Sequence, residues 1–257
     1  MIESLEWLST HIKRKVNSAF APLIGRQQGL RGWPGQCVAC LASVRRHGLC
    51  RDCQADLPLN GCQCRRCALP LALAGSVEVV CGECLRAPPP FQRVIVPWRY
   101  QFPVNQLISR YKYQGQRALG QPLIQGLTDE VISALSREPW RRPDLLIPSP
   151  MHPVRQRQRG FNQAEEIAEH LSRNIAVPWS VTLLKRHRTS APQSGLNRRE
   201  RLANLRGCFH VTGTPPARIA LVDDVITTGA TARVLAGELI RAGAREVEVW
   251  ALARTPV

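Results

Sequence analysis

Two adjacent carboxylates near the C-terminus, Asp223 and Asp224, stand between a short apolar run and a run of small and hydroxyl-bearing residues. Carboxylate oxygens accept hydrogen bonds from the hydroxyl groups of a sugar. The residues of the following turn lack bulky side chains, so their backbone N–H groups and hydroxyls can surround one anion; they are Thr227, Thr228, Gly229, Ala230 and Thr231. The pattern indicates a ribose 5-phosphate site, with the sugar on the acids and the phosphate in the turn. The alternative is an ordinary strand, turn and helix in which the acids cap the helix and the threonines fill the turn.

The elements that must position these groups are a strand and a helix. Ile219 to Val222 are apolar without interruption, which predicts a strand that is covered on both faces and ends at the acids. Apolar residues then keep helical spacing from Thr231 to Ala242, and Gly243 is a suitable stop. A phosphate in the turn would therefore meet the positive end of a helix.

A second predicted strand, Leu145 to Pro148, leads into a proline-rich turn and then into three arginines at alternate positions, Arg155, Arg157 and Arg159. If this strand neighbours the strand that ends at Asp223, its loop faces the same crevice. Guanidinium groups suit phosphate oxygens, so we expect a pyrophosphate there.

A third segment, Arg186 to Arg206, is polar, basic and long for a connection, which is typical of a lid or binding loop. If the bound ribose carries the pyrophosphate as a leaving group, its displacement passes through an oxocarbenium-like state. A closed lid would keep water away from that state. For Arg198, Arg199 and Arg201, a solvated helical face is the alternative.

Nine of the ten cysteines lie in a short N-terminal stretch, and eight of them form C-x2-C pairs. Two such pairs can hold one tetrahedral Zn²⁺ with four thiolates, a closed structural site. Sequential pairing gives two groups, the first of Cys37, Cys40, Cys50 and Cys53, and the second of Cys64, Cys67, Cys81 and Cys84. Spacing alone leaves an interleaved arrangement open. Cys62 could replace a neighbouring ligand, and Cys208 is expected to be a buried thiol.

Domain organisation follows from composition. We expect an amphipathic helix and linker at 1–36, a double zinc ribbon at 37–86, and an α/β domain at 91–257 after a run of prolines. Strands are predicted at 93–98, 145–148, 181–185, 219–222 and 247–252, with helices at 104–111, 119–135, 162–173 and 231–242. Their alternation predicts a mostly parallel, doubly wound sheet.

The charge balance favours an anionic partner. The net charge is +16, and only four of the 35 basic residues are lysine. Arginine in place of lysine can also reflect genomic base composition, and aromatic residues are few, at 5%. No apolar stretch is long enough to span a bilayer, and residues 1–20 lack the apolar core of a signal peptide, so a cytoplasmic location is expected.

The whole order of motifs resembles the ComF/GntX family of competence-associated, phosphoribosyltransferase-like proteins. The cysteine pairs are followed by Tyr111-Lys112-Tyr113-x-Gly115, by Pro148-Ser149-Pro150-Met151-His152, by Arg159-Gly160-Phe161-Asn162-Gln163 and by Gln193-Ser194-x-Leu196-Asn197-Arg198. The run from Ile219 to Thr231 is similar to the phosphoribosyl pyrophosphate (PRPP) signature of type I phosphoribosyltransferases. The resemblance implies a type I phosphoribosyltransferase-like fold behind a double zinc ribbon, and a link to natural transformation or DNA use.

By the same resemblance, Asp223 and Asp224 would bind the ribose 2′ and 3′ hydroxyls, and residues 227–231 the 5-phosphate. Ser149, Arg155, Arg159 and Gly160 would belong to the pyrophosphate loop, with Mg²⁺ accompanying PRPP, and Arg198, Arg199 and Arg201 to the lid. Purine-salvage members carry an aspartate where this chain has Thr227, so the resemblance points away from a purine acceptor. No catalytic residue is identified.

Two functions fit the pattern. The first is a phosphoribosyltransferase in which an acceptor of unknown identity attacks C1 of the ribose and pyrophosphate leaves. The alternative is a non-catalytic module that senses PRPP or a nucleotide while its ribbon and arginines hold single-stranded DNA or a competence helicase.

Overall fold

The computed structural model describes residues 35–44, 48–72, 79–187, 205 and 207–256, and the chain divides into two compact units. The first comprises Met1–Leu57 and Gln106–Leu123, and the second comprises Pro58–Asn105 and Ile124–Val257. The first cysteine group belongs to the first unit. The second cysteine group shares the second unit with every strand of the sheet, so this unit begins inside the stretch predicted as the ribbon module.

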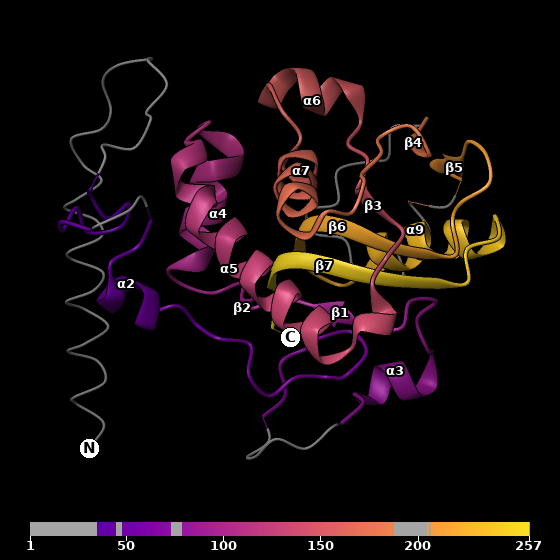
Figure 1. Ribbon diagram of the computed structural model, residues 1–257, viewed down its shortest axis with the longest axis horizontal. Coiled ribbons are helices and arrows are strands. Elements are labelled where there is room, and N and C mark those ends of the chain that lie inside the picture. The colour runs from indigo at the N-terminus through magenta and orange to yellow at the C-terminus, as the bar shows by residue number, and fades with distance from the viewer. Residues whose placement is uncertain (1–34, 45–47, 73–78, 188–204, 206, 257) are drawn as a thin grey trace. The chain divides into compact units, whose positions relative to one another are not determined.

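The core of the second unit is a parallel sheet whose described strands run in the order β1-β7-β6-β3, with β2 also pairing with β7 (Figure 1). The strands are β1 (Val94–Ile95), β2 (Trp98–Arg99), β3 (Leu145–Pro148), β6 (Arg218–Ile226) and β7 (Glu246–Arg254). After its first residue, β7 is buried at every position, as a strand covered on both faces must be. The predicted mostly parallel sheet is confirmed.

Helices cover both faces of this sheet. Helix α9 (Ala230–Arg241) packs its leucines into one core cluster with Ile219, Leu221 and Val249. Strand side chains alternate between faces, so the neighbouring residues point the other way, toward the side of α7 (Gln163–Ile175), which contacts β3 and β6 (Figure 1). The remaining described helices are α2 (Arg51–Ala55), α3 (Gly82–Arg86), α4 (Val104–Tyr113), α5 (Arg117–Arg137), the 3-10 helix η2 (Pro139–Arg141) and α6 (Pro153–Arg159).

Two predicted strands differ from the structure. The strand expected at 93–98 is divided into β1 and β2, because Pro97 has no N–H to give to a ladder. The strand expected at 181–185 is β4 (Leu184–Arg186), which lies outside the parallel sheet and pairs antiparallel with β5 (Phe209–Val211), a strand that the sequence did not predict.

The end of α9 confirms the predicted glycine stop. Gly243 has φ 116°, and its N–H donates to the carbonyl of Ile240 at 3.1 Å. The next N–H, of Ala244, reaches back to Leu239 at 3.0 Å, which completes a Schellman motif. The helix therefore ends at the position where a glycine can adopt the positive φ that this motif requires.

Candidate sugar-phosphate site and cysteine groups

The two acids lie within β6 rather than after it. The prediction that the strand ends at Asp223 is wrong, because Val225 and Ile226 still find partners, Ala253 and Arg254, on the long neighbouring strand β7. Both carboxylates are half-buried, and Asp223 accepts a hydrogen bond through Oδ1 from the N–H of Asp224 at 2.9 Å. The ladder thus pairs Asp223 with Ala251 of β7 and places both acids at the carboxyl end of the sheet.

The turn after β6 leads directly into α9. Gly229 is the N-cap residue with φ 72°, a conformation that favours glycine, and the hydroxyl of Thr228 accepts from the N–H of Ala230 at 3.4 Å. No acidic residue stands in the first turn of α9, so nothing in that turn offsets the positive helix end. Thr227 is exposed. Thr231 is the second residue of α9, and its side chain is half-buried. This geometry is suited to an anion.

The second predicted strand, β3, is the direct neighbour of β6. Pro148 is in register with Val222, and the N–H of Ser149 donates to the carbonyl of Val222 at 2.8 Å. The condition under which the two loops share one crevice is therefore met. Ser149 and Asp223 are the residues that directly follow this pair on the two strands, so both lie at the same edge of the sheet.

The arginines that follow lie on a short helix, α6, that the sequence analysis treated as loop. Its signal was present: His152 is the N-cap and accepts through Nδ1 from the N–H of Val154 at 3.3 Å, and Pro153 occupies the first helical position. The polar composition of this helix hid it, since it has no apolar face. Gly160 has φ 79° and is the C-cap residue at which α6 ends.

One asparagine closes this helical insertion at its base. Asn162 is buried, donates through its side-chain amide to the carbonyl of Ser149 at 3.2 Å, and accepts from the N–H of Ala164 at 3.1 Å as the N-cap of α7. The start and the end of the arginine-bearing segment are therefore fixed to each other. The arginines project from a defined base and not from a free loop.

The charge at this edge is positive. Arg155 and Arg159 are half-buried and Arg157 is exposed. Burial lowers the pKa of Arg186 on β4, and the positive charge of Arg155 lowers it further. Arg186 was identified from sequence only as the start of the lid. The lid residues Arg198, Arg199 and Arg201 lie outside the described residues.

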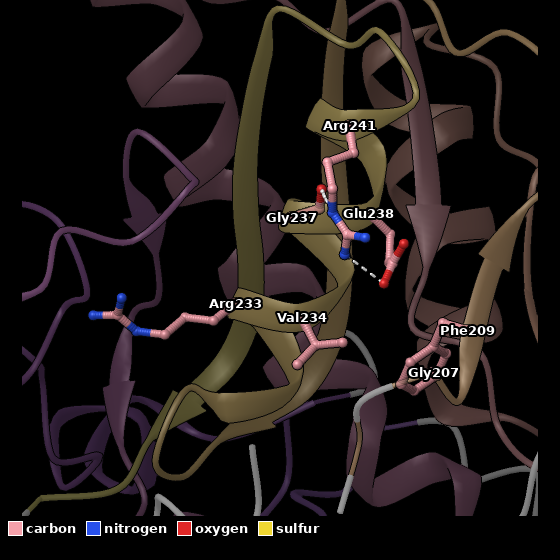
Figure 2. A pocket seen from close by; sticks show the side chains of 7 residues that line it. All are labelled: Gly207, Phe209, Arg233, Val234, Gly237, Glu238 and Arg241. Carbon is pink, nitrogen blue, oxygen red and sulfur yellow. Dashed lines mark hydrogen bonds and ion pairs between the residues drawn. The ribbon is translucent and has the colours of Figure 1, made fainter. Parts of the chain in front are cut away.

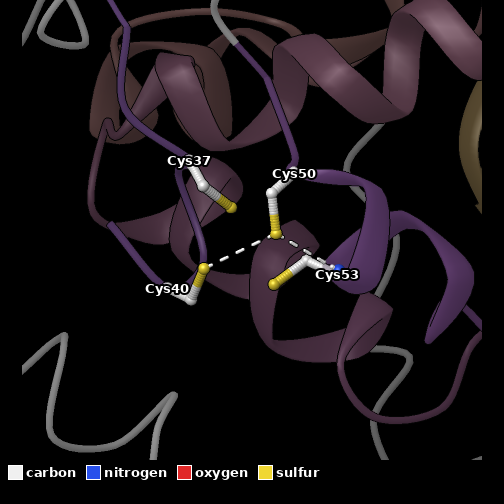
Figure 3. Close-up of side chains that lie close together, drawn as sticks. All are labelled: Cys37, Cys40, Cys50 and Cys53. Carbon is white, nitrogen blue, oxygen red and sulfur yellow. Dashed lines mark hydrogen bonds between the residues drawn. The ribbon is translucent and has the colours of Figure 1, made fainter. Parts of the chain in front are cut away.

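Each cysteine group brings four thiols together in sequential pairs. The ligand atoms of Cys37, Cys40, Cys50 and Cys53, shown in Figure 3, all lie within 4.8 Å of one another, as do those of Cys64, Cys67, Cys81 and Cys84. The distances Cys40 Sγ to Cys50 Sγ, 3.6 Å, and Cys67 Sγ to Cys81 Sγ, 3.7 Å, match the edge of about 3.8 Å expected for a tetrahedron with Zn–S bonds of about 2.3 Å. The residues fit structural zinc. Cys62 belongs to neither group, and Cys208 is buried.

The two groups repeat one backbone design. In the first group, the backbone N–H of Cys37 donates to the carbonyl of Ala42 at 2.8 Å, and the N–H of Leu41 donates to the carbonyl of Cys37 at 2.9 Å. In the second group, the N–H of Cys64 donates to the carbonyl of Leu69 at 2.8 Å, and the N–H of Ala68 donates to the carbonyl of Cys64 at 2.9 Å. The residue after each first pair has positive φ, 64° at Leu41 and 53° at Ala68. The second pair of each group straddles the start of a one-turn helix, α2 or α3.

Hydrogen bonding inside the groups favours thiolate at selected cysteines. A hydrogen bond from the side chain of Cys67 lowers the pKa of Cys64 to about 4, and the same bond raises the pKa of Cys67. Burial raises the pKa of Cys37, but hydrogen bonds from backbone N–H groups, including those of Cys50 and Cys40, outweigh it and lower the pKa to about 7. Thiolates are the form that a metal requires.

A further cavity of about 550 Å³ lies along α9 and beside β5 (Figure 2). Val234, Gly237 and Phe209 are among its lining residues, and Glu238 and Arg241, which also line it, form an ion pair of 2.6 Å. Figure 2 shows the side chain of Arg233 directed away from that pair. This pocket runs along the flank of the helix and includes neither acid of β6, so it is not the predicted sugar-phosphate site.

The sheet and the cysteine groups define an α/β protein with a double zinc ribbon, and a family model described as "Double zinc ribbon domain" matches residues 32–85. The chain is 32% identical over 225 residues to Competence protein F of Haemophilus influenzae, covering 85% of this chain and 96% of that protein. It is 33% identical over 225 residues to DNA utilization protein YhgH of Escherichia coli K12, covering 86% and 98%. Competence protein ComFC of Streptococcus pneumoniae is 31% identical over 156 residues, covering 60% and 65%. The chain belongs to this family, ComF/GntX.

Solved phosphoribosyltransferases are also similar in structure. A purine phosphoribosyltransferase from Pyrococcus horikoshii matches with 18% identity, 51% and 72% coverage and a TM-score of 0.33. A hypoxanthine phosphoribosyltransferase from Staphylococcus aureus matches with 12% identity, 50% and 61% coverage and a TM-score of 0.34. Within the described parts of the chain, no helix has both the length and the apolar character needed to cross a membrane.

Proposed function

We propose that the chain binds PRPP with Mg²⁺ at the carboxyl ends of β3 and β6, and that it serves the uptake or use of DNA. The acids Asp223 and Asp224 bind the ribose hydroxyls, and the turn from Thr227 to Thr231 binds the 5-phosphate. The loop and helix from Ser149 to Gly160 bind the pyrophosphate through Arg155 and Arg159. Mg²⁺ supplies positive charge to the pyrophosphate when it is bound.

The observation that carries this proposal is the adjacency of β3 and β6. It puts an acceptor-rich pair, Asp223 and Asp224, next to a cation-rich helix, α6, at one edge of a parallel sheet. PRPP has the matching order of groups, since its ribose hydroxyls lie between two phosphate-bearing ends. The positive end of α9 faces the remaining phosphate.

The role in DNA uptake or use rests on the family. Two relatives that align over nearly their whole length carry the names Competence protein F and DNA utilization protein YhgH. The cysteine groups then act as structural zinc ribbons, since a closed four-thiolate site leaves no position for a reacting water.

Calorimetry tests the ligand. PRPP is titrated into wild type and into Asp223→Ala/Asp224→Ala, with and without Mg²⁺. Loss of several hydrogen bonds to ribose hydroxyls, each worth about 0.5–1.5 kcal/mol, predicts at least a tenfold weaker affinity in the variant. The matched control is Asp129→Ala/Glu130→Ala, which removes two adjacent exposed acids from α5. Equal binding by wild type and the β6 variant rejects the site.

A second measurement separates an enzyme from a sensor. Pyrophosphate release is followed with PRPP and a panel of bases, amines and single-stranded DNA. Release with one acceptor, abolished in the β6 variant, identifies a phosphoribosyltransferase. PRPP binding without release of pyrophosphate in the presence of any acceptor identifies a sensing module.

A further inference from the structure

A buried arginine lies between the second cysteine group and the proposed phosphate turn. Arg254 is the last residue of β7, is only 4% exposed, and is in register with Ile226 at the end of β6. Arginine is rarely buried to this extent unless its donors are satisfied and its charge is compensated. The hydrogen-bond partners of this side chain therefore identify the segments that Arg254 holds in place.

The guanidinium group connects two segments that are far apart in sequence. Its Nη1 donates to the carbonyl of Ile226 at 3.1 Å and also to the carbonyl of Thr227, the first residue of the turn. Its Nε donates to the carbonyl of Cys67 at 3.1 Å, a cysteine of the second group. A single rigid fork thus binds the backbone of the turn and the backbone of a metal-binding pair.

The hydrogen bond from Nε to the carbonyl of Cys67 also brings the guanidinium group next to the second cysteine group. Burial lowers the pKa of Arg254, and the thiols of Cys67, Cys81 and Cys64 act in the opposite direction. Four thiolates around one Zn²⁺ carry a net charge of −2. With zinc bound, the second group would be the counter-ion of the buried guanidinium.

The segment that carries Cys67 and Ala68 packs against the core of the sheet. Ala68, which follows Cys67, is fully buried in the same cluster as Val249 and Ala251 of β7, and Cys67 packs against that cluster. Asn60 fixes this segment by donating through its side chain to the carbonyl of Ala68 at 2.9 Å and through its backbone to the carbonyl of Pro97 at 2.8 Å. A movement of this segment would therefore displace the Cys67 carbonyl that Arg254 binds.

We propose that Arg254 is a positioning residue that couples metal binding at Cys64, Cys67, Cys81 and Cys84 to the geometry of the turn at Thr227. Loss of the metal releases the guanidinium and loosens the turn. Because coupling is reciprocal, a ligand in the turn slows metal release. The ligand part of this coupling rests on the proposed function, while the metal and backbone part does not.

The test uses the full chain loaded with zinc. Arg254→Met keeps the length of the side chain and removes its donors and charge, and Arg254→Lys keeps the charge without the fork. The matched control is Arg245→Met, an exposed arginine just before the other end of β7. Two quantities are measured: the rate at which each zinc ion passes to a chelator, and amide hydrogen exchange in the peptide that contains residues 226–231.

We expect one of the zinc ions of Arg254→Met to leave at least tenfold faster than in wild type, in line with other residues that support metal ligands. We also expect faster exchange in the 226–231 peptide, an intermediate result for Arg254→Lys, and no change for Arg245→Met. In wild type, Mg-PRPP should slow release of that zinc ion, and in Arg254→Met it should not.

Wild-type rates of zinc release and of exchange in both Arg254 variants overturn the proposal. If the variants do not fold, the wild-type protein still provides a test: removal of both zinc ions must speed amide exchange at 226–231, and unchanged exchange refutes the coupling. Failure of PRPP to bind wild type is a different result. It rejects the proposed function and leaves the coupling to be judged by the exchange data.

Discussion

A glycine in α5 gives the sharpest quantitative prediction from the fold. A Cβ added at Gly126 would lie 2.4 Å from Cη2 and 2.6 Å from Cζ2 of Trp98. Trp98 cannot easily yield, because it is only 6% exposed and its backbone is paired with Ala253 in the sheet. Ordinary contact begins near 3.4 Å, so the helix or the indole ring would have to move by about 1 Å in a close-packed interior.

The expected effect of Gly126→Ala is a loss of stability. Overpacking of this severity costs about 3 kcal/mol, at the upper end of the usual range, and alanine returns about 1 kcal/mol through its higher helix propensity. The free energy of unfolding should therefore fall by about 2 kcal/mol, which lowers the Tm by roughly 4–8 °C for a chain of this size. Chemical denaturation and thermal melting, both at fixed zinc concentration, measure it.

The matched control is the same substitution in α9. A Cβ at Gly237 would have its nearest neighbour, Pro90 Cγ, at 4.0 Å, so Gly237→Ala should gain about 1 kcal/mol from helix propensity. The two variants should shift stability in opposite directions. If Gly126→Ala is as stable as Gly237→Ala, the described packing of α5 on Trp98 is refuted.

Three further predictions concern metal, capping and pH. Metal analysis should give two zinc ions per chain for wild type and for Cys62→Ser but one for Cys81→Ser; loss of zinc in Cys62→Ser would contradict the grouping of the thiols. Asn162→Ala should lower the free energy of unfolding by about 1–2 kcal/mol through loss of the α7 cap, while Asn162→Asp, which keeps the accepting oxygen, should lose less; equal losses would argue against a capping role. Hydrogen bonds from Arg218 lower the pKa of Asp144, so the stability that this carboxylate contributes is fully present above its unfolded pKa of about 3.9 and is lost as the pH falls toward the folded pKa. Asp144→Asn should flatten the acid limb of the stability profile, and an unchanged limb would exclude Asp144 as a contributor.

Sequence patterns predicted the helices and strands that have a clear hydrophobic pattern or a recognisable capping residue. The apolar run at β3, the asparagine that begins α7 and the glycine that ends α9 each carry a local signal strong enough to fix a boundary. The two cysteine groups were predictable for the same reason, since C-x2-C spacing is set by the reach of two thiolates to one ion.

The remaining features depend on partners that no local pattern contains. β6 continues through Asp223 and Asp224 because β7 is long enough to pair with it, and polar residues in a strand give no sign of that. α6 lacks an apolar face, and β4 has its own partner in β5, some twenty residues away. Arg254 was not selected, because one arginine among many in an arginine-rich chain is distinguished only by its burial.

The repeated backbone of the two cysteine groups has different consequences for each copy. Both groups use the same pair of backbone hydrogen bonds and have a left-handed residue at the same position, Leu41 or Ala68, yet Ala68 belongs to the core of the sheet. The second ribbon cannot be moved between proteins as an independent cassette, because its removal would open the interior of the α/β fold. Any shortened version of the chain that keeps the sheet intact must therefore begin ahead of Asn60.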